Sequence, residues 1–267
     1  MPQIMINNQS LHYLDQGNGP VLLFGHSYLW DSNMWKKQIA EFSKKYRCIV
    51  PDLWGHGRSS PLNETPSIAS LAGDHWALMQ ALKINSFSII GLSVGGMWAA
   101  QLALDHPNEI EKLVIMDSFV GIEPPDTLQS YLQILDTVEQ ANAMPQPLIK
   151  QLLPTFLSDI TLEHQPAIAE AFAKSLETLA KDNISTIVAL GRCIFNRKDI
   201  MPLLPKLNMP TLILVGEFDK PRPPHEAKKM ADLITSAQCK IVPNAGHISA
   251  LEQPKEVNKL LHAFLKN

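Results

Sequence analysis

The sequence predicts an α/β fold in which a mostly parallel sheet is flanked by helices and carries an inserted helical cap. Short apolar runs rich in Val, Ile and Leu recur along the chain, and longer stretches with helical spacing separate several of them. The strand pattern then stops for about 80 residues before it resumes. With 267 residues, of which 45% are hydrophobic, the chain is long enough to bury a large core as one compact body.

The apolar runs are the candidate strands. A parallel strand that helices cover on both faces must be apolar throughout, and residues 86–90 and 211–215 have this pattern. Residues 4–14 instead alternate between polar and apolar side chains, which predicts a leading antiparallel hairpin. The candidate parallel strands are 21–24, 48–51, 86–90, 113–116, 211–215 and 240–242.

The helical insertion follows the fourth of these runs. We expect residues 1–119 and 199–267 to form the α/β core and residues 120–198 to form the cap. No flexible linker marks either junction, so the insertion is expected to lie on the carboxyl edge of the sheet, where open α/β sheets bind their ligands. Its candidate helices, separated by prolines and by Asp182-Asn183, are 127–143, 147–157, 160–181 and 184–196.

Composition excludes several kinds of partner. The net charge is -3 and no basic run is present, so we expect neither nucleic acid nor an anionic membrane surface as a partner.

The sequence also predicts a soluble cytoplasmic protein. No apolar stretch approaches the roughly 20 residues of a spanning helix, and the first residues lack the basic flank and apolar core of an export signal. Cys48, Cys193 and Cys239 are far apart, which predicts reduced thiols and no metal site.

The strongest chemical signal is the segment Gly91-Leu92-Ser93-Val94-Gly95. It directly follows one candidate strand and directly precedes a stretch with helical spacing, so it predicts a sharp turn between the two. Glycine on both sides allows the strand and the helix to approach closely, and the turn presents the serine at a helix N-terminus. Ser93 is therefore the candidate nucleophile.

A serine hydroxyl is a weak nucleophile that needs a base, and the base needs an acid to orient it. His247 lies in a glycine-containing loop just after the last candidate strand, and Asp219 comes shortly after the run 211–215. Asp117 also ends a candidate strand and is the rival for the role of the acid. Glu252 is expected to hold the histidine loop or to cap the following helix.

With these residues the chain resembles the α/β-hydrolase superfamily, in its cap-bearing branch of carboxylesterases and enol-lactone hydrolases. The chain order Ser93, Asp219, His247 is the order of that superfamily. The resemblance covers nearly the whole chain and implies an eight-stranded sheet with an inserted cap. Three further segments carry it: the loop Asp52-Leu53-Trp54-Gly55-His56-Gly57-Arg58-Ser59, the histidine loop 246–254, and His26-Ser27-Tyr28 with Trp35, in which Ser27 stands where glycine is usual.

The resemblance also implies an oxyanion hole. Its donors would be the backbone N–H groups of Tyr28 and Val94, because the tetrahedral intermediate places a full negative charge on the former carbonyl oxygen. His26 is expected to brace the loop that carries Tyr28. The other histidines expected to be structural or solvated are His56, His75 and His106.

Aromatic and flexible apolar side chains near these loops are candidates for the substrate pocket. Core packing is the competing interpretation for each, and the preferred one for Trp98. Arg192 and Arg197 lie late in the insertion, where they would either grip a substrate carboxylate or, more ordinarily, cover a solvated helix face. The pocket candidates are Trp30, Trp54, Met97 and Tyr131.

Together these residues predict hydrolysis of carboxylic esters with short to medium acyl chains, through a Ser-His-Asp triad and an acyl-enzyme, with no metal or organic cofactor. The expected partner is a small-molecule ester, and the oligomeric state stays open. Superfamily members that open epoxides or remove halide use a carboxylate where this chain has Ser93, so those reactions are disfavoured. Enol-lactone, thioester and carbon-carbon hydrolysis and perhydrolysis stay open, as does, in a different class, a non-catalytic ligand-binding receptor.

Overall fold

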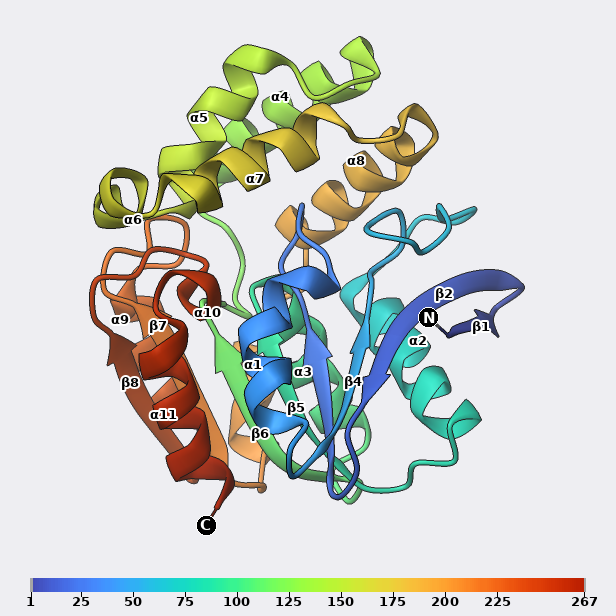
Figure 1. The fold of residues 1–267 in the computed structure, drawn as a ribbon, viewed down its shortest axis with the longest axis vertical. Helices are drawn as coiled ribbons and strands as arrows, with labels where there is room; N and C mark the ends of the chain where they lie inside the picture. Colours follow the sequence, from blue (N-terminus) through green and yellow to red (C-terminus); the bar gives the residue numbers. More distant parts are fainter. Residues whose placement is uncertain (1, 267) are drawn as a thin grey trace.

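The computed structural model describes residues 2–266, which form a sheet of eight strands with helices on both faces (Figure 1). The strand order is β1-β2-β4-β3-β5-β6-β7-β8, and all neighbours from β4 onward pair in parallel. The hairpin β1-β2 and the pairing of β2 with β4 are antiparallel. The strands are β1 (Gln3–Ile6), β2 (Gln9–Gln16), β3 (Val21–Gly25), β4 (Arg47–Pro51), β5 (Phe87–Leu92), β6 (Ile110–Met116), β7 (Thr211–Gly216) and β8 (Ala237–Val242).

The predicted α/β fold and its strands are confirmed. Each predicted parallel strand is present, with its ends shifted by at most three residues, and the leading hairpin is antiparallel. Every residue of β5 and of β7 is buried, because helices cover both faces of the sheet centre. β8 is one of the two edge strands and keeps several exposed side chains, which is typical of a sheet edge.

Two sets of helices cover the sheet. α1 and α11 contact each other on one face, and α3 packs against β5 and β6 on the other, with α2 packed on α3 and α9 on β7 and β8 (Figure 1). The bounds are α1 (Lys36–Phe42), α2 (Ile68–Ala81), α3 (Val94–Asp105), α9 (Pro224–Ala231), α10 (Ser249–Glu252) and α11 (Pro254–Leu265), with short 3-10 helices at Ser32–Trp35 and Met201–Lys206.

Five helices between β6 and β7 form a separate layer beyond the carboxyl ends of the strands (Figure 1). One detail differs from the prediction, because the segment 160–181 is not one helix. α6 ends at His164, Gln165 leaves the helical conformation, and α7 restarts with Pro166, whose ring removes the N–H that a continuous helix requires. The helices are α4 (Pro125–Ala141), α5 (Gln146–Phe156), α6 (Asp159–His164), α7 (Pro166–Glu177) and α8 (Lys181–Phe195).

Among residues 2–266, none of the helices has both the length and the apolar character needed to cross a membrane.

Candidate active site

Ser93 lies in a sharp turn between β5 and α3. Its backbone has φ 57° and ψ -119°, a strained conformation that a side chain other than glycine rarely adopts. The turn is close-packed, because a Cβ added at Gly91 would lie 2.2 Å from the carbonyl oxygen of Gly95, and one at Gly95 would lie 2.3 Å from that of Gly25. Only glycine fits at both flanking positions, which is the physical basis of the sequence motif.

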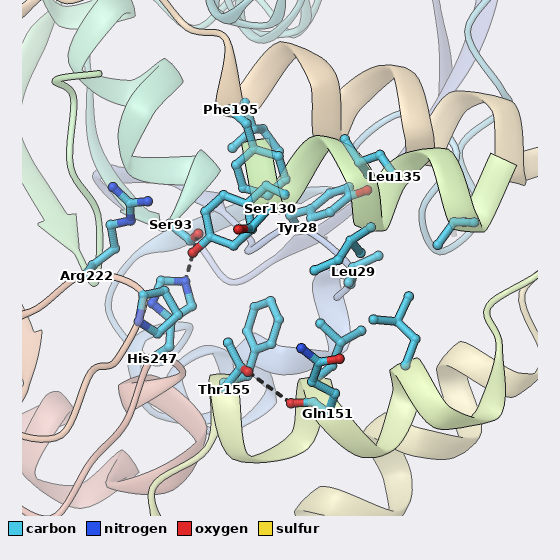
Figure 2. A pocket seen from close by; sticks show the side chains of 18 of the residues that line it. Tyr28, Leu29, Ser93, Ser130, Leu135, Gln151, Thr155, Phe195, Arg222 and His247 are labelled. Atoms are coloured by element: carbon cyan, nitrogen blue, oxygen red, sulfur yellow. Dashed lines mark hydrogen bonds between the residues drawn. The ribbon is translucent and has the colours of Figure 1, made fainter. Parts of the chain in front are cut away.

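The side chains of Ser93, His247 and Asp219 form a hydrogen-bonded relay. Ser93 Oγ lies 3.0 Å from His247 Nε2, and His247 Nδ1 lies 3.0 Å from each carboxylate oxygen of Asp219 (Figure 2 shows the first of these contacts). All three residues are buried, with 8% of Ser93 and 3% of each of the other two exposed. The backbone N–H of Arg222 donates to Asp219 Oδ1 at 2.8 Å, which holds the carboxylate in place. Three residues far apart in sequence therefore meet in the order that serine nucleophiles require.

Glu252 anchors the loop that carries His247. Its Oε1 accepts hydrogen bonds from the backbone N–H groups of Gly246 (2.9 Å) and Ile248 (3.1 Å). Its Oε2 accepts from the N–H of Ser158 (2.9 Å) and the hydroxyl of Thr161 (2.8 Å), at the junction of α5 and α6. This buried carboxylate thus joins the histidine loop to the inserted helices, a structural role as expected from the sequence.

Asp117, the rival acid, has hydrogen-bond partners other than His247. Its Oδ1 accepts a hydrogen bond from the N–H of Gly216 at 2.8 Å, and its Oδ2 accepts from the hydroxyl and the N–H of Ser249. Burial and then the nearby Asp219 carboxylate raise the pKa of Asp117 well above its ordinary value, and the donors from Gly216 and Ser249 oppose this shift without cancelling it. The geometry therefore favours Asp219 as the partner of His247.

The raised pKa of Asp117 predicts a particular pH dependence of stability. Below the ordinary carboxyl pKa, Asp117 is protonated in both the folded and the unfolded protein. Above it, the folded protein retains a proton that the unfolded chain releases. The stabilising contribution of the protonated carboxyl is therefore lost as the pH rises toward the pKa of the folded state. Asp117→Asn cannot titrate. The difference between the free energies of unfolding of Asp117→Asn and the wild type is therefore expected to shift in favour of the variant from about pH 4 upward, by at most about 1.4 kcal/mol per pH unit.

Urea unfolding of both proteins at pH 4.5, 5.5 and 6.5 measures this difference. Parallel stability curves across that range would show that Asp117 has an ordinary pKa in the folded protein.

Two buried histidines shape the loop that carries Tyr28. His26 Nε2 accepts the N–H of Leu53 at 2.8 Å, and His56 Nε2 accepts the N–H of Leu29 at 3.1 Å. Burial lowers the pKa of His26, and it lowers that of His56 to about 3, so both rings stay neutral acceptors near neutral pH. The positive φ of this loop falls at Leu29 (69°) and not at Ser27, so the loop closes without the usual glycine.

The N–H groups implied as oxyanion donors lie on this loop and at the start of α3. Within residues 2–266, neither Tyr28 nor Val94 uses its backbone N–H in a hydrogen bond to a protein acceptor. Both groups are therefore available to a ligand oxygen.

The relay opens into a cavity of about 240 Å³ lined mostly by apolar side chains from α4, α5 and α8. Tyr131 lines it and stacks on Phe195, with ring centroids 4.2 Å apart. Met97, on α3, lines its inner side. Figure 2 shows Ser93, His247 and Arg222 at one end of the cavity and Leu29, Leu135 and Gln151 farther away. An apolar cavity of this volume beside a serine relay suits a small organic substrate with an apolar part.

A family model described as the alpha/beta hydrolase fold matches residues 20–254. The chain belongs to the alpha/beta hydrolase fold family. 3-Oxoadipate enol-lactonase 2 of Acinetobacter baylyi is 26% identical over 252 residues, which cover 94% of this chain and 90% of that protein.

Two solved structures of similar shape are enzymes. A thermophilic esterase from Thermogutta terrifontis has a TM-score of 0.91 and 27% identity, covering 99% of this chain and 97% of that one. An enol-lactonase from Burkholderia xenovorans has a TM-score of 0.90 and 26% identity, covering 100% of both chains.

Two of the aromatic residues proposed for the pocket of this alpha/beta hydrolase do not line it. Trp30 stacks on Phe172 at 4.3 Å, and Trp54, only 2% exposed, donates its indole N–H to Asp74 at 2.8 Å. Met97 and Tyr131 do line it. Trp98 is fully buried and stacks on His75, so core packing explains it.

The two arginines of the insertion do not line this cavity either. Arg192 donates to Asp136 and Glu139 at the surface, whereas Arg197 is buried and donates to Glu123, so Arg197 does not lie on a solvated helix face.

Among the lining residues that the sequence analysis missed, Arg222 is the one with a cationic side chain. It follows Asp219 by three positions, in the segment Pro221-Arg222-Pro223. That position was the available signal, because a side chain so close to the acid of the relay is carried to the same edge of the sheet.

Within residues 2–266, no three His, Cys, Asp or Glu side chains lie close enough together to hold a metal ion. Cys48, Cys193 and Cys239 are unpaired.

Proposed function

We propose that the protein is a serine hydrolase of carboxylic esters with short to medium acyl chains. The observation that carries the proposal is the relay from Ser93 Oγ through His247 to Asp219, with 3.0 Å between partners, at one end of an apolar cavity. Membership of the family, the esterase of similar structure and the enol-lactonase relatives support hydrolysis at a carbonyl.

The chemistry follows from the relay. Ser93 Oγ attacks the ester carbonyl while His247 Nε2 takes its proton, and Asp219 holds the imidazole in the required tautomer. The N–H groups of Tyr28 and Val94 donate to the oxyanion of the tetrahedral intermediate. His247 then returns the proton to the leaving alcohol, which leaves an acyl-enzyme. Water, deprotonated by His247, attacks the acyl-enzyme, and His247 then returns this proton to Ser93 Oγ as the carboxylic acid leaves.

Residues 120–198 serve in this proposal as a cap over the core formed by residues 1–119 and 199–267. Helices α4, α5 and α8 supply most of the cavity lining, whereas the relay residues come from the core. The cap therefore sets the volume that a substrate finds, and the core sets the chemistry.

A cavity of limited volume predicts an optimum in acyl length. Each buried methylene gains roughly 0.8 kcal/mol until the chain meets the cap, and longer chains must displace packed side chains. For p-nitrophenyl esters, kcat/KM is expected to rise with acyl length, to peak at about two to eight carbons and to fall steeply beyond. Tyr131→Ala should move the peak to longer chains, because the Tyr131 ring fills part of the cavity against Phe195.

Steady-state kinetics over an acyl series measures this optimum. Tyr131→Phe is the matched control, since it keeps the ring volume and should keep the wild-type optimum. Efficient turnover of palmitoyl esters by the unmodified enzyme would show that the helices do not close the cavity.

Enol-lactone hydrolysis is the second candidate, favoured by two enol-lactonase relatives with 26% and 25% identity. Ring opening of a lactone passes through the same acyl-enzyme, so the relay serves both reactions. A panel of acyl esters, thioesters, lactones and diketo acids, with Ser93→Ala as the blank, separates these substrates. Absence of turnover of a simple aryl acetate and of every member of the panel would instead favour a non-catalytic receptor.

A further inference from the structure

A buried cluster of charges lies where the inserted helices meet the core. Glu123 precedes α4, Arg197 follows α8 and Arg222 precedes α9. Arg197 Nη1 donates to Glu123 Oε1 at 2.6 Å, and Arg222 Nη2 donates to the same oxygen. The side chains are 2% (Glu123), 2% (Arg197) and 6% (Arg222) exposed. One carboxylate thus holds two guanidinium groups in fixed positions.

The cluster has more donors than acceptors. Among residues 2–266, Arg222 Nη1 is buried without a hydrogen bond. It forms an ion pair at 3.5 Å with Glu226 Oε2, which is also buried without a hydrogen-bond partner. Burial raises the pKa of Glu226, against the lowering effect of Arg222. An arginine never loses its charge in proteins, so Arg222 Nη1 keeps buried N–H donors that are engaged by the ion pair with Glu226 and by no hydrogen bond.

The two arginines border different cavities. Arg222 lines the cavity of the relay, at the end that holds Ser93 and His247 (Figure 2), whereas Arg197 lines a separate cavity beside α2. No acidic side chain is among the described residues that line the relay cavity. The Arg222 guanidinium also influences the hydroxyl of Tyr131. Burial raises the pKa of this hydroxyl, and the charge of Arg222 opposes that rise. The serine end of the cavity is therefore lined by the guanidinium of Arg222, whose paired carboxylates, Glu123 and Glu226, are not part of the lining. Arg222 Nη1 keeps N–H donors that make no hydrogen bond among the described residues.

We infer that Arg222 binds a carboxylate of the substrate, so that the preferred substrates are small esters or lactones with a carboxylate a few bonds from the scissile carbonyl. This inference rests on the proposed function. In a cavity lined mostly by apolar side chains, a charge-assisted hydrogen bond to an already positioned guanidinium discriminates strongly between an anionic substrate and its neutral isostere. Glu123 positions Arg222 for this contact.

The test compares two esters of equal length, mono-p-nitrophenyl glutarate and p-nitrophenyl pentanoate. The ratio of their kcat/KM values is expected to favour the glutarate ester in the wild type and to fall by about 10- to 100-fold in Arg222→Gln. Arg197→Gln is the matched control, because it removes a guanidinium from the same Glu123 but on the side of the other cavity; its ratio should stay within about threefold of the wild type. Arg222→Lys, which keeps a point charge, should give an intermediate ratio.

An unchanged ratio in Arg222→Gln, or an equal fall in Arg197→Gln, would overturn the inference while leaving ester hydrolysis intact. Thermal denaturation shows whether each variant is folded, and Arg222→Lys replaces Arg222→Gln if the latter is not. If neither ester is turned over, the proposed function fails, and calorimetric binding of glutarate to Ser93→Ala then decides the anion site. Binding that is lost when Arg222→Gln is added to Ser93→Ala, or weakened when Arg222→Lys is added, supports it. No binding to Ser93→Ala, or equally tight binding to the double variant, overturns it.

Discussion

Replacing Ser93 with alanine is expected to lower kcat for p-nitrophenyl esters by about 10⁶-fold, because it removes the atom that forms the acyl-enzyme while leaving only the binding and oxyanion contributions. The fold should survive, since the hydroxyl makes no hydrogen bond other than the one to His247 among the described residues. Initial rates on a single ester, with circular dichroism and thermal denaturation beside them, measure both effects.

Ser118→Ala is the matched control for this substitution. Ser118 follows β6 and is also buried, and its hydroxyl donates to the carbonyl oxygen of Ser93 at 2.7 Å. Among the described residues it has no hydrogen bond to His247. This variant should lose about 1 kcal/mol of stability and retain activity within about tenfold. Retention of more than about one hundredth of the activity in Ser93→Ala would exclude Ser93 as the nucleophile.

Replacing Asp219 with asparagine should cost about 10⁴ in kcat, as it does for the acid of serine proteases, because the amide stabilises the wrong tautomer of the imidazole. His247 Nδ1 lies 3.0 Å from both oxygens of Asp219, so an amide N–H in that position leaves Nε2 protonated and unable to accept the proton of Ser93.

Asp117→Asn supplies the comparison at the same edge of the sheet. Its carboxylate contacts Gly216 and Ser249 rather than the imidazole, so activity should change less than about tenfold. Kinetics of the two variants on one ester rank them directly, and the reverse ranking would move the role of the acid to Asp117.

The strands and the relay could be predicted from the sequence because their signals are local. A buried parallel strand is a continuous apolar run, as in 86–90, and the turn at Ser93 requires glycines that a short motif reveals. Parallel strands then carry whatever follows them to one edge of the sheet. Asp219 and His247 follow β7 and β8, so their meeting with Ser93 follows from the topology.

The lining of the cavity could not be predicted in the same way. Whether Trp30 faces a ligand or stacks on Phe172 depends on the packing of α7, which no local pattern specifies. Arg197 and Arg222 are 25 positions apart, and each is some 74 to 99 positions from the Glu123 that holds them, so their pairing is set by the packing of the insertion on the core. The break between α6 and α7 did have a local signal, in Pro166.

The proposed nucleophile is tested most directly by covalent labelling. A fluorophosphonate reacts with a serine only where a neighbouring base activates it, so the intact protein should gain the mass of one adduct as activity is lost, and peptide mapping should place that adduct on Ser93. Ser93→Ala should gain none. An adduct on another serine, or full activity in unlabelled protein after complete treatment, would contradict the role of Ser93 as nucleophile.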